Sequence, residues 1–368
     1  MSSRKSGDNG EVVRRIKASS DGIYRKILAR KKPSMQFPVR SLANVRYHPS
    51  KGYLEMAGLK KERTLSVSTV KNFAQTLRMI ALSKSLIEMD TFATKRDAYY
   101  QTKNWEEARC DEQDESDTIM DDIEAYFALN KEQLGFRPDE HGGSVAGELI
   151  VVDHEPGTTR RIEIDCTRFG SGSYAIPSAV EHLEFKTKAD FVLAIETSGM
   201  FERLNYHKFW KTAKCILVSM NGVPTRAVRR FIRRLADSRK IPVYVFVDCD
   251  PYGIGNIYRT LKVGSGNNAH LNRFFCVPQA RFLGVTPQDI TDYKLPTHPL
   301  KDVDVKRARD ALKNDPFFRH HKSWQHAIEL LMKMGVRAEQ QALAKHGLNY
   351  VIDEYLPKKL KRTDQFLP

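Results

Sequence analysis

The stretch PVYVFVDCDPYGIGN, residues 242–256, begins with an apolar, β-branched run and continues into a turn with two glycines. Two similar apolar runs precede it, DFVLAIE at 190–196 and KCILVSM at 214–220. Nearly continuous apolar strands are typical of a parallel sheet that is covered on both faces. A helical pattern at 224–240 lies between the second and third runs. The sequence therefore predicts an α/β fold with a parallel sheet.

Acidic residues end two of these predicted strands. Glu196 closes the first run, and Asp248 and Asp250 close the third. Groups at the carboxyl ends of neighbouring parallel strands meet in one crevice, where three carboxylates repel one another unless a cation lies among them. Hard oxygen ligands suit Mg²⁺, which also accepts phosphate oxygens. The pattern therefore indicates a magnesium site; the alternative is that these acids cap helices or pair with nearby arginines.

The two glycines that follow the third run, Gly253 and Gly255, have the spacing of a dinucleotide-binding fingerprint. The third glycine of that fingerprint would fall at Tyr258, and the preceding Asp-Cys-Asp would repel a pyrophosphate. We therefore expect no nucleotide cofactor here. The chain also has no Gly-x-x-x-x-Gly-Lys-Ser/Thr sequence, so ATP would have to be bound by another protein.

The N-terminal part of the chain has a different character. Residues 1–66 are rich in Lys and Arg, and a helical pattern at 11–32 is followed by Pro33, Pro38 and Pro49. This composition predicts a basic arm rather than a packed core.

Between residues 67 and 165 the pattern predicts three helices and then two strands. Ser68 and Thr69 can cap the first helix, in which apolar residues recur at helical spacing. The apolar positions are Phe73, Leu77, Ile80 and Ile87, the next two helices are expected at 96–102 and 117–130, and the strands are ELIVVD (148–153) and RIEID (161–165). This outline is that of a winged helix, which is common among DNA-binding modules. Further helices are expected at 303–314 and 323–334.

Two adjacent tyrosines lie among basic residues in KRDAYY, residues 95–100. A phenol with a pKa of about 10 is a poor nucleophile at neutral pH, so its attack on a phosphate needs a base or a metal, and a cation to hold the phosphate. Arg96 is placed for the second task. A tyrosine suits reversible strand cutting because its phosphate ester conserves the energy of the broken bond. The simpler alternative is that Tyr99 and Tyr100 are ordinary amphipathic residues, one packed and one exposed.

The overall charge favours a polyanionic partner. Sixty Lys and Arg against 45 Asp and Glu give a net charge of +15, which makes nucleic acid the first candidate. A dense acidic run at 106–124 is interpreted as a solvated helix face. No apolar run approaches the roughly 20 residues that span a bilayer, and no secretory signal begins the chain, so a cytoplasmic, nucleoid-associated protein is expected. The five widely spaced cysteines are expected to be reduced.

Taken together, these features resemble the topoisomerase VI A-subunit family, which also includes the meiotic double-strand-break transesterases. The matching motifs occur in the family's order and cover about residues 66–285. They are KRDAYY (95–100), the strand that ends at Glu196, NGVPTRAVRRF (221–231), VDCDPYGIGN (247–256) and VPQARFLGV (277–285).

The resemblance implies a mixed α/β chain with a basic arm at 1–66 and a winged-helix DNA-cleavage domain of the catabolite-activator type at 67–165. A Toprim metal-binding domain with C-terminal helical additions would occupy 166–368. It also implies the site residues: Tyr100 as the nucleophile with Tyr99 beside it, Arg96 as the phosphate clamp, Asp97 as an orienting residue, and Glu196, Asp248 and Asp250 as the Mg²⁺ ligands.

Family resemblance further implies partners. Family members act as A-subunit dimers in which one protomer's tyrosine meets the other's metal site, so that both strands of double-stranded DNA are cut with 5′-phosphotyrosyl links. Duplex passage would need ATP from a B subunit within an A2B2 heterotetramer. The basic arm is a candidate for the B-subunit contact, and simple tethering of DNA is its competing role.

Three other functions stay open on the sequence. A meiotic-type transesterase would cut once without strand passage, although the compact chain favours the archaeal-type topoisomerase. A DNA-binding protein with an inactive Toprim sheet would not need Tyr100. A Toprim nuclease that uses water would leave free 5′-phosphate ends.

Overall fold

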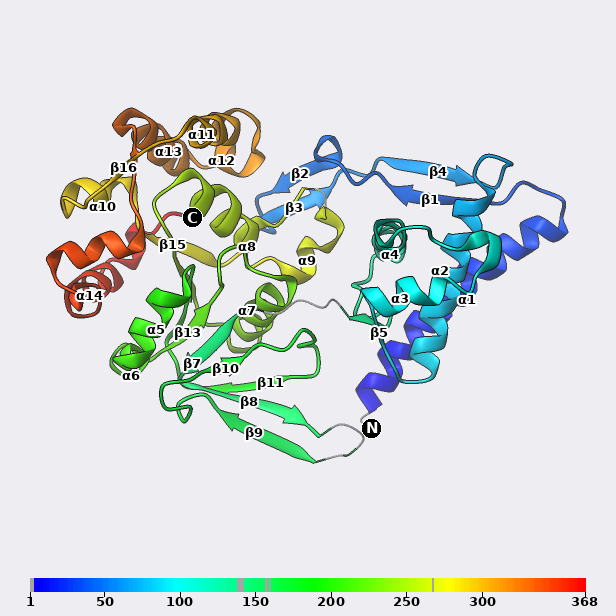
Figure 1. The fold of residues 1–368 in the computed structure, drawn as a ribbon, viewed down its shortest axis with the longest axis horizontal. Helices are drawn as coiled ribbons and strands as arrows, with labels where there is room; N and C mark the ends of the chain where they lie inside the picture. Colours follow the sequence, from blue (N-terminus) through cyan, green and yellow to red (C-terminus); the bar gives the residue numbers. More distant parts are fainter. Residues whose placement is uncertain (1–2, 138–141, 156–157, 159, 267) are drawn as a thin grey trace.

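The computed structural model describes residues 3–137, 142–155, 158, 160–266 and 268–368, and it contains two hydrophobic cores. The first core lies among four helices, which occupy the right-hand part of Figure 1, and the second surrounds a central sheet. The four helices are α1 (Ser3–Leu28), α2 (Val70–Glu88), α3 (Lys95–Thr102) and α4 (Gln113–Phe127). The three helices predicted within 67–130 are therefore confirmed, with ends shifted by a few residues.

The N-terminal segment is not a loose arm, and the prediction that it stays outside a core is wrong. Val12, Ile16 and Ile23 of α1 are buried in the same cluster as Phe73 and Ile80 of α2. These three residues lie about one and two helical turns apart, so they share one apolar face of α1. This face packs on α2. The chain then forms two antiparallel ladders, β1 (Ser34–Pro38) with β4 (Lys60–Thr64) and β2 (Val45–His48) with β3 (Tyr53–Met56).

The acidic run at 106–124 is not simply a solvated helix face either. Asp121 and Asp122 on α4 each lie 3.1 Å from an Arg40 nitrogen, and Asp122 also lies 2.7 Å from Arg63 of β4. The basic N-terminal residues and the acidic helix therefore neutralise each other within the fold.

The first helix of this group does not have the predicted side-chain cap. Thr69 occupies the position before α2, but the structure gives its side chain no capping hydrogen bond. Instead, its hydroxyl donates to the Thr64 carbonyl oxygen and contacts the Ser66 hydroxyl at 2.8 Å, which closes the turn between β4 and α2.

The predicted parallel sheet is confirmed as the centre of a six-stranded mixed sheet with the order β10-β7-β13-β12-β14-β15. Strand β12 pairs in parallel with both β13 and β14, and β14 pairs in parallel with β15. The strands are β7 (Ser144–Gly147), β10 (Tyr174–Ala175), β12 (Phe191–Ile195), β13 (Cys215–Ser219), β14 (Val243–Phe246) and β15 (Ala280–Gly284). Every residue of β12 and β13 is buried, as expected for strands covered on both faces.

The two strands expected to complete a winged helix form, but they lie elsewhere. They are β8 (Leu149–His154) and β9 (Arg161–Asp165), and with β11 (Glu184–Thr187) they make a separate antiparallel sheet. Leu149 and Val151 are buried in the core of the central sheet rather than among helices α1–α4. The prediction that these strands form a wing on the three helices is therefore wrong. In their place, a two-residue ladder of β5 (Ala93–Thr94) and β6 (Phe136–Arg137) lies beside α3.

Helices cover the central sheet and extend to the C-terminus (Figure 1). Between β12 and β15 the chain forms α5 (Ser198–Tyr206), α6 (Phe209–Thr212), α7 (Arg226–Arg239), the π-helical turn η3 (Gly253–Tyr258), α8 (Arg259–Val263) and α9 (Asn272–Phe275). Further helices are α10 (Pro287–Asp292), α11 (Asp302–Asn314), α12 (Pro316–His320), α13 (Lys322–Met334) and α14 (Leu356–Leu360), with a ladder of β16 (His298–Pro299) and β17 (Val336–Arg337). The helices expected at 303–314 and 323–334 are confirmed as α11 and α13.

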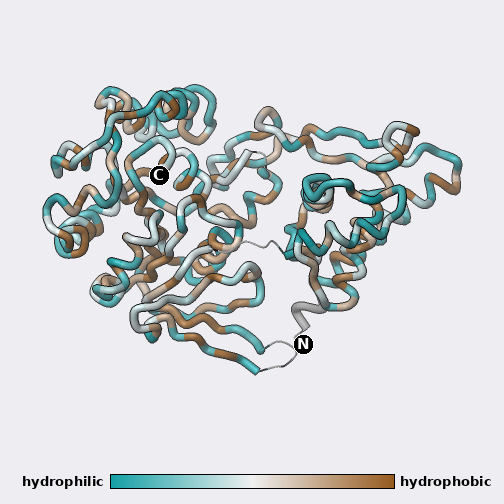
Figure 2. Tube along the Cα trace, viewed as in Figure 1, coloured by the Kyte–Doolittle hydropathy of each residue, from teal (hydrophilic) through white to brown (hydrophobic). Residues whose placement is uncertain are grey.

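Figure 2 shows hydrophobic stretches along the strands and many hydrophilic residues along the outer helices. In the described part of the chain, no helix combines the length and the apolar character needed to cross a membrane. All five cysteines are buried, and the structure joins none of them in a disulfide.

Candidate functional site

Glu196 and Asp248 meet at the carboxyl end of the central strands. Strands β12 and β14 are in register through Ile195 and Phe246, so the residues just beyond their ends lie side by side. The backbone N–H of Asp248 donates to Glu196 Oε2 at 2.8 Å, and the Glu196 N–H donates to the Phe246 carbonyl oxygen at 3.0 Å. The sheet therefore brings together two acids that lie on different strands.

Asp250 joins them through the turn that follows β14. The Gly253 N–H donates to Asp250 Oδ1 at 2.6 Å, and the Gln340 N–H donates to Asp248 Oδ1 at 2.8 Å. A Cβ on Gly253 would lie 3.3 Å from Asp250 Oδ1 and 3.4 Å from Glu196 Oε2, so these two carboxylates border the same small space. We call Glu196, Asp248 and Asp250 the acid site.

Glu196 of the acid site is buried, Asp248 and Asp250 are half-buried, and their carboxylates repel one another. Burial, together with the charges of Asp248 and Asp250, raises the pKa of Glu196 to about 8. Burial and the charge of Asp250 raise the pKa of Asp248 to about 6, and burial raises that of Asp250. Each shift shows that the ionised form is unfavourable without a compensating positive charge.

The donor set of the acid site fits a hard divalent cation. Each of the hydrogen bonds described above occupies one oxygen of its carboxylate, and a carboxylate has a second oxygen that can ligate. Oxygen-only ligation suits Mg²⁺, and a divalent ion would relieve the repulsion that raises the three pKa values. Within the described residues, no three acidic, His or Cys side chains are already gathered around one ion position.

The structure adds a segment that the sequence did not single out. Arg337 Nη1 lies 3.7 Å from Asp250 Oδ2, and the Glu339 charge contributes to the raised pKa values of Glu196 and Asp248. Next to them, Gln340 contacts Asp248 through its backbone N–H. No local motif marks these residues, because β17 and the turn after it come beside β14 only in the folded chain.

The two tyrosines of α3 differ in their surroundings. Tyr100 is 58% exposed, whereas Tyr99 is half-buried and donates from its hydroxyl to the Asp111 carbonyl oxygen at 3.0 Å. The Lys103 ammonium lies 4.4 Å from the centre of the Tyr99 ring. Tyr100 is therefore the tyrosine that a large substrate can reach.

The other two residues predicted around the tyrosines have different positions on α3. Arg96 is exposed and lies four residues before Tyr100, a spacing that places both on one helix face. Asp97 belongs to a capping box: its carboxylate accepts from the Thr94 N–H at 2.9 Å, and the Thr94 hydroxyl oxygen accepts from the Asp97 N–H at 3.1 Å. Asp97 therefore holds the start of α3.

Within one copy of the chain, the structure does not bring Tyr100 to the acid site. Helix α3 packs in the core of α1–α4, whereas the strands that end at the acids belong to the other core. Figure 1 shows α3 well apart from β13 and β15, which flank β12 and β14 in the sheet.

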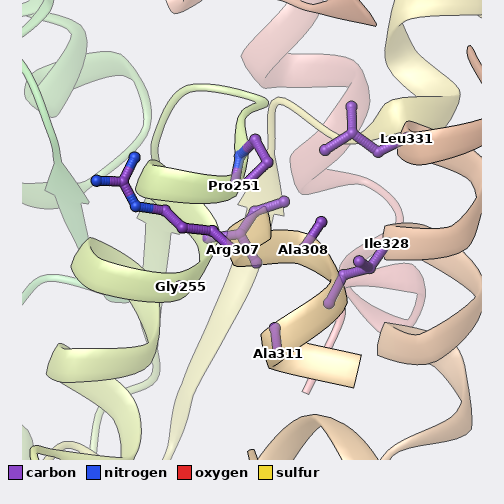
Figure 3. Close-up of a pocket in the computed structure, with 8 residues that line it drawn as sticks. Pro251, Gly255, Arg307, Ala308, Ala311, Ile328 and Leu331 are labelled. Carbon is purple, nitrogen blue, oxygen red and sulfur yellow. The ribbon is translucent and has the colours of Figure 1, made fainter. Parts of the chain in front are cut away.

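Two cavities are lined in part by Pro251 and Gly255, which follow Asp250 in the chain. The smaller has a volume of about 10 Å³ and lies between the start of η3 and helices α11 and α13; Figure 3 shows its lining of Pro251, Gly255, Arg307, Ala308, Ala311, Ile328 and Leu331. The larger has a volume of about 410 Å³ and is open to solvent. In its wall Arg259 is paired with Asp315 at 2.8 Å, so this arginine already has a partner within the chain.

Three family models match successive parts of the chain. Residues 71–136 match a family described as type IIB DNA topoisomerase, and residues 139–189 match an all-β domain of the DNA topoisomerase VI alpha subunit. Residues 191–360 match the Toprim domain that the topoisomerase 6 A subunits share with Spo11. The all-β match covers β8, β9 and β11, the strands that lie apart from the three helices.

Curated relatives match almost from end to end. The chain is 51% identical to the A subunit of the type 2 DNA topoisomerase 6 of Methanocaldococcus jannaschii, over 94% of this chain and 93% of the relative. It is 36% identical to the protein of that name from Methanothermobacter thermautotrophicus, over 96% and 98%. The corresponding protein of Pyrococcus abyssi is 34% identical over 98% of this chain and 96% of its own length.

Proposed function

The chain belongs to the family of topoisomerase VI A subunits, and from this membership we propose that it cleaves double-stranded DNA as the A component of a type IIB topoisomerase. Tyr100 is the nucleophile, and Glu196, Asp248 and Asp250 are the Mg²⁺ ligands. The observation that carries the proposal is the combination of an exposed tyrosine on α3 with carboxylates converging at the ends of parallel strands.

The proposed reaction is a transesterification. The Tyr100 phenolic oxygen attacks a DNA phosphorus and loses its proton, the bond from phosphorus to the 3′ oxygen breaks, and that oxygen gains a proton. The products are a 5′-phosphotyrosyl link and a free 3′-hydroxyl, and reversal of the same step reseals the strand. When bound, Mg²⁺ would supply positive charge to the phosphate as a Lewis acid.

The protein residues around Tyr100 have supporting roles in this proposal. Arg96, one helical turn earlier on the same face, holds the phosphate by charge and hydrogen bonding. Asp97 acts as a positioning residue, because its contacts with Thr94 fix the first turn of the helix that carries Tyr100. Tyr99 anchors the other face of α3 through its bond to Asp111.

The separation of Tyr100 from the acid site supports a dimer. Because the two lie on different cores of one chain, we propose that the tyrosine of one protomer works with the acid site of its partner. Two such composite sites would cut both strands of a duplex, which is the first step of strand passage, relaxation and decatenation.

A separate ATPase B subunit completes the proposed enzyme, as an A2B2 heterotetramer acting on chromosomal DNA in the nucleoid. We propose that residues 1–66 contact the B subunit, and the exposed end of α1 is the candidate surface for this contact. Tyr24, Ile27 and Leu28 are 60%, 49% and 65% exposed there, although the opposite face of the helix is packed. An exposed apolar group of this kind is typical of a protein contact.

A cleavage assay tests the proposal. The chain is combined with its B subunit, supercoiled DNA, Mg²⁺ and a non-hydrolysable ATP analogue, and the reaction is stopped with detergent. We expect double-strand breaks with protein on the 5′ ends and their loss in Tyr100→Phe. We expect their retention at a reduced level in Tyr99→Phe, which keeps the Tyr100 hydroxyl but loses the anchoring bond to Asp111. Breaks with free 5′ ends would indicate a nuclease that uses water, and breaks that survive Tyr100→Phe would exclude this nucleophile.

A further inference from the structure

Residues 337–340 form one wall of the acid site. In the sequence they are separated from Asp250 by most of the C-terminal helices. Ala338 and Cys249 exchange two backbone hydrogen bonds, at 2.8 and 3.1 Å. Gln340 donates its N–H to Asp248 and its side-chain amide to the Phe246 carbonyl oxygen, both at 2.8 Å. The wall is therefore fixed directly against the end of β14, and the backbone that carries Arg337 and Glu339 is held beside the carboxylates.

Arg337 in this wall has an unusual environment for a cation. Its Nη1 lies 3.7 Å from Asp250 Oδ2, beyond hydrogen-bond distance, and its side chain is only 23% exposed. Its Nε is buried and, among the residues that the structure describes, has no hydrogen-bond partner. A guanidinium has five N–H donors, so Arg337 is held near the acids mainly by charge and retains donors that it does not use here.

The charges of Arg337 and Glu339 act on the same carboxylates in opposite directions. Burial raises the pKa values of Asp248 and Asp250, and the Arg337 charge acts against this by lowering both. Glu339 is exposed, and its charge adds to the burial that raises the pKa values of Glu196 and Asp248. One short segment thus carries both a neutralising and a repelling group.

We propose that Arg337 is the internal counter-ion of the acid site and competes with Mg²⁺ for Asp250, whereas Glu339 strengthens the attraction for the metal. This inference rests on the proposed function, because it takes the acid site to bind Mg²⁺. A fixed positive charge beside Asp250 cancels part of the field that draws a divalent cation. Arg337 is therefore a positioning residue that keeps the carboxylates together before the metal arrives and keeps the metal exchangeable afterwards.

The roles of Arg337 and Glu339 are tested by titrating the full chain with MgCl2 in a calorimeter at constant ionic strength. We expect Arg337→Gln to bind Mg²⁺ roughly 3- to 10-fold more tightly than the wild type, and Glu339→Gln roughly threefold more weakly. The matched control is Arg309→Gln, which removes one positive charge from an exposed position on α11 and should change the affinity less than about twofold. A purely structural role would instead weaken binding in both variants.

Two further variants make the outcome decisive. Arg337→Lys keeps the charge and should restore near wild-type affinity, and the rise in unfolding temperature caused by Mg²⁺ should be larger for Arg337→Gln than for the wild type. Should Arg337→Gln not fold, Glu339→Gln carries the test, and unchanged Mg²⁺ affinity there overturns the inference. Equal or weaker binding by folded Arg337→Gln also overturns it. A double variant, Glu196→Gln with Asp248→Asn, tests the metal site separately. If it binds Mg²⁺ as tightly as the wild type, the metal site itself is refuted, and with it the proposed function.

Discussion

At Gly253 the backbone passes so close to the acid site that a hydrogen atom is the only side chain with room. A Cβ there would lie 2.8 Å from the Asp248 carbonyl oxygen, nearer than real Cβ atoms approach, and that oxygen is a backbone atom, which cannot swing away as the end of a side chain can. Of the two glycines that resemble a dinucleotide fingerprint, Gly253 therefore has another physical cause, the close approach of η3 to the carboxylates.

This geometry predicts a difference between two neighbouring glycines. Gly253→Ala should lower the free energy of unfolding by about 1–3 kcal/mol, because the turn must move away from Asp248, and it should weaken Mg²⁺ binding. Gly255 has no atom within 4 Å of its Cβ position, so Gly255→Ala should be neutral or slightly stabilising. Denaturant unfolding and Mg²⁺ titration of both variants check this, and equal losses in the two would contradict it.

Helix α3 shows how a short element can be held firmly enough to present a nucleophile. It has only eight residues, and Ala98 and Thr102 are its buried side chains, so little packing energy is available. The capping box of Thr94 and Asp97 satisfies two of the N–H groups at its start, and the Thr94 contacts lower the Asp97 pKa. The orientation of Tyr100 therefore depends on a local cap as well as on the core.

The cap predicts that Asp97 contributes through hydrogen-bond acceptance rather than through its charge. Asp97→Asn keeps an acceptor for the Thr94 N–H and should retain most of the DNA cleavage activity. Asp97→Ala loses the acceptor and should cost about 1 kcal/mol of local stability, with reduced cleavage. Cleavage assays on both variants and on Thr94→Ala check this. Equal loss of activity in Asp97→Asn and Asp97→Ala would point to a role for the charge itself.

Across the whole molecule, the two cores are joined by a buried group of charges. Arg226 at the start of α7 contacts Glu124 of α4 with two nitrogens, at 2.6 and 3.2 Å, and also lies 3.4 Å from Glu132. The Glu124 side chain is 1% exposed, and the Lys131 N–H donates to it at 2.7 Å. Because a buried charge is costly without its partner, this pair makes the relative position of the two cores sensitive to a single proton.

The pair predicts a specific loss of stability in acid. Burial alone raises the pKa of Glu124, but Arg226, His270 and Lys131 together lower it to about 2, below the ordinary value of 4.5. A depressed pKa contributes stability that is complete above about pH 4.5 and is lost as the pH falls towards 2; its size is roughly 3 kcal/mol.

Glu124→Gln should therefore destabilise the chain by about 3 kcal/mol at pH 7, and this deficit should shrink as the pH falls from 5 towards 2. Urea unfolding of the wild type and the variant across this range measures it. The comparison with the variant is needed because burial raises the pKa of the neighbouring Glu132, which has the opposite effect on stability. A deficit that does not depend on pH would contradict the assignment to Glu124.

Local pattern in the sequence determined the elements that the structure confirms. The apolar runs that became β12, β13 and β14 could be recognised because burial on both faces leaves a continuous hydrophobic signature. The convergence of Glu196 and Asp248 followed, since the ends of adjacent parallel strands must coincide. The exposed Tyr100 on a short helix could likewise be predicted, from helical periodicity and from the motif around it.

Only the tertiary structure decided which elements share a core. The strands β8 and β9 look like a wing when they follow three helices, but their apolar side chains pack against the central sheet. Helix α1 looks like a basic arm, because the buried Val12, Ile16 and Ile23 lie among many charged residues and leave a weak signal. Arg337, Glu339 and Gln340 reach the acid site through backbone bonds to Cys249 and Asp248, contacts between distant segments that no local pattern encodes. Sequence patterns indicate which side of a segment is buried and which is exposed to water. They do not indicate which other segment packs against the buried side, because that contact forms only when the chain folds.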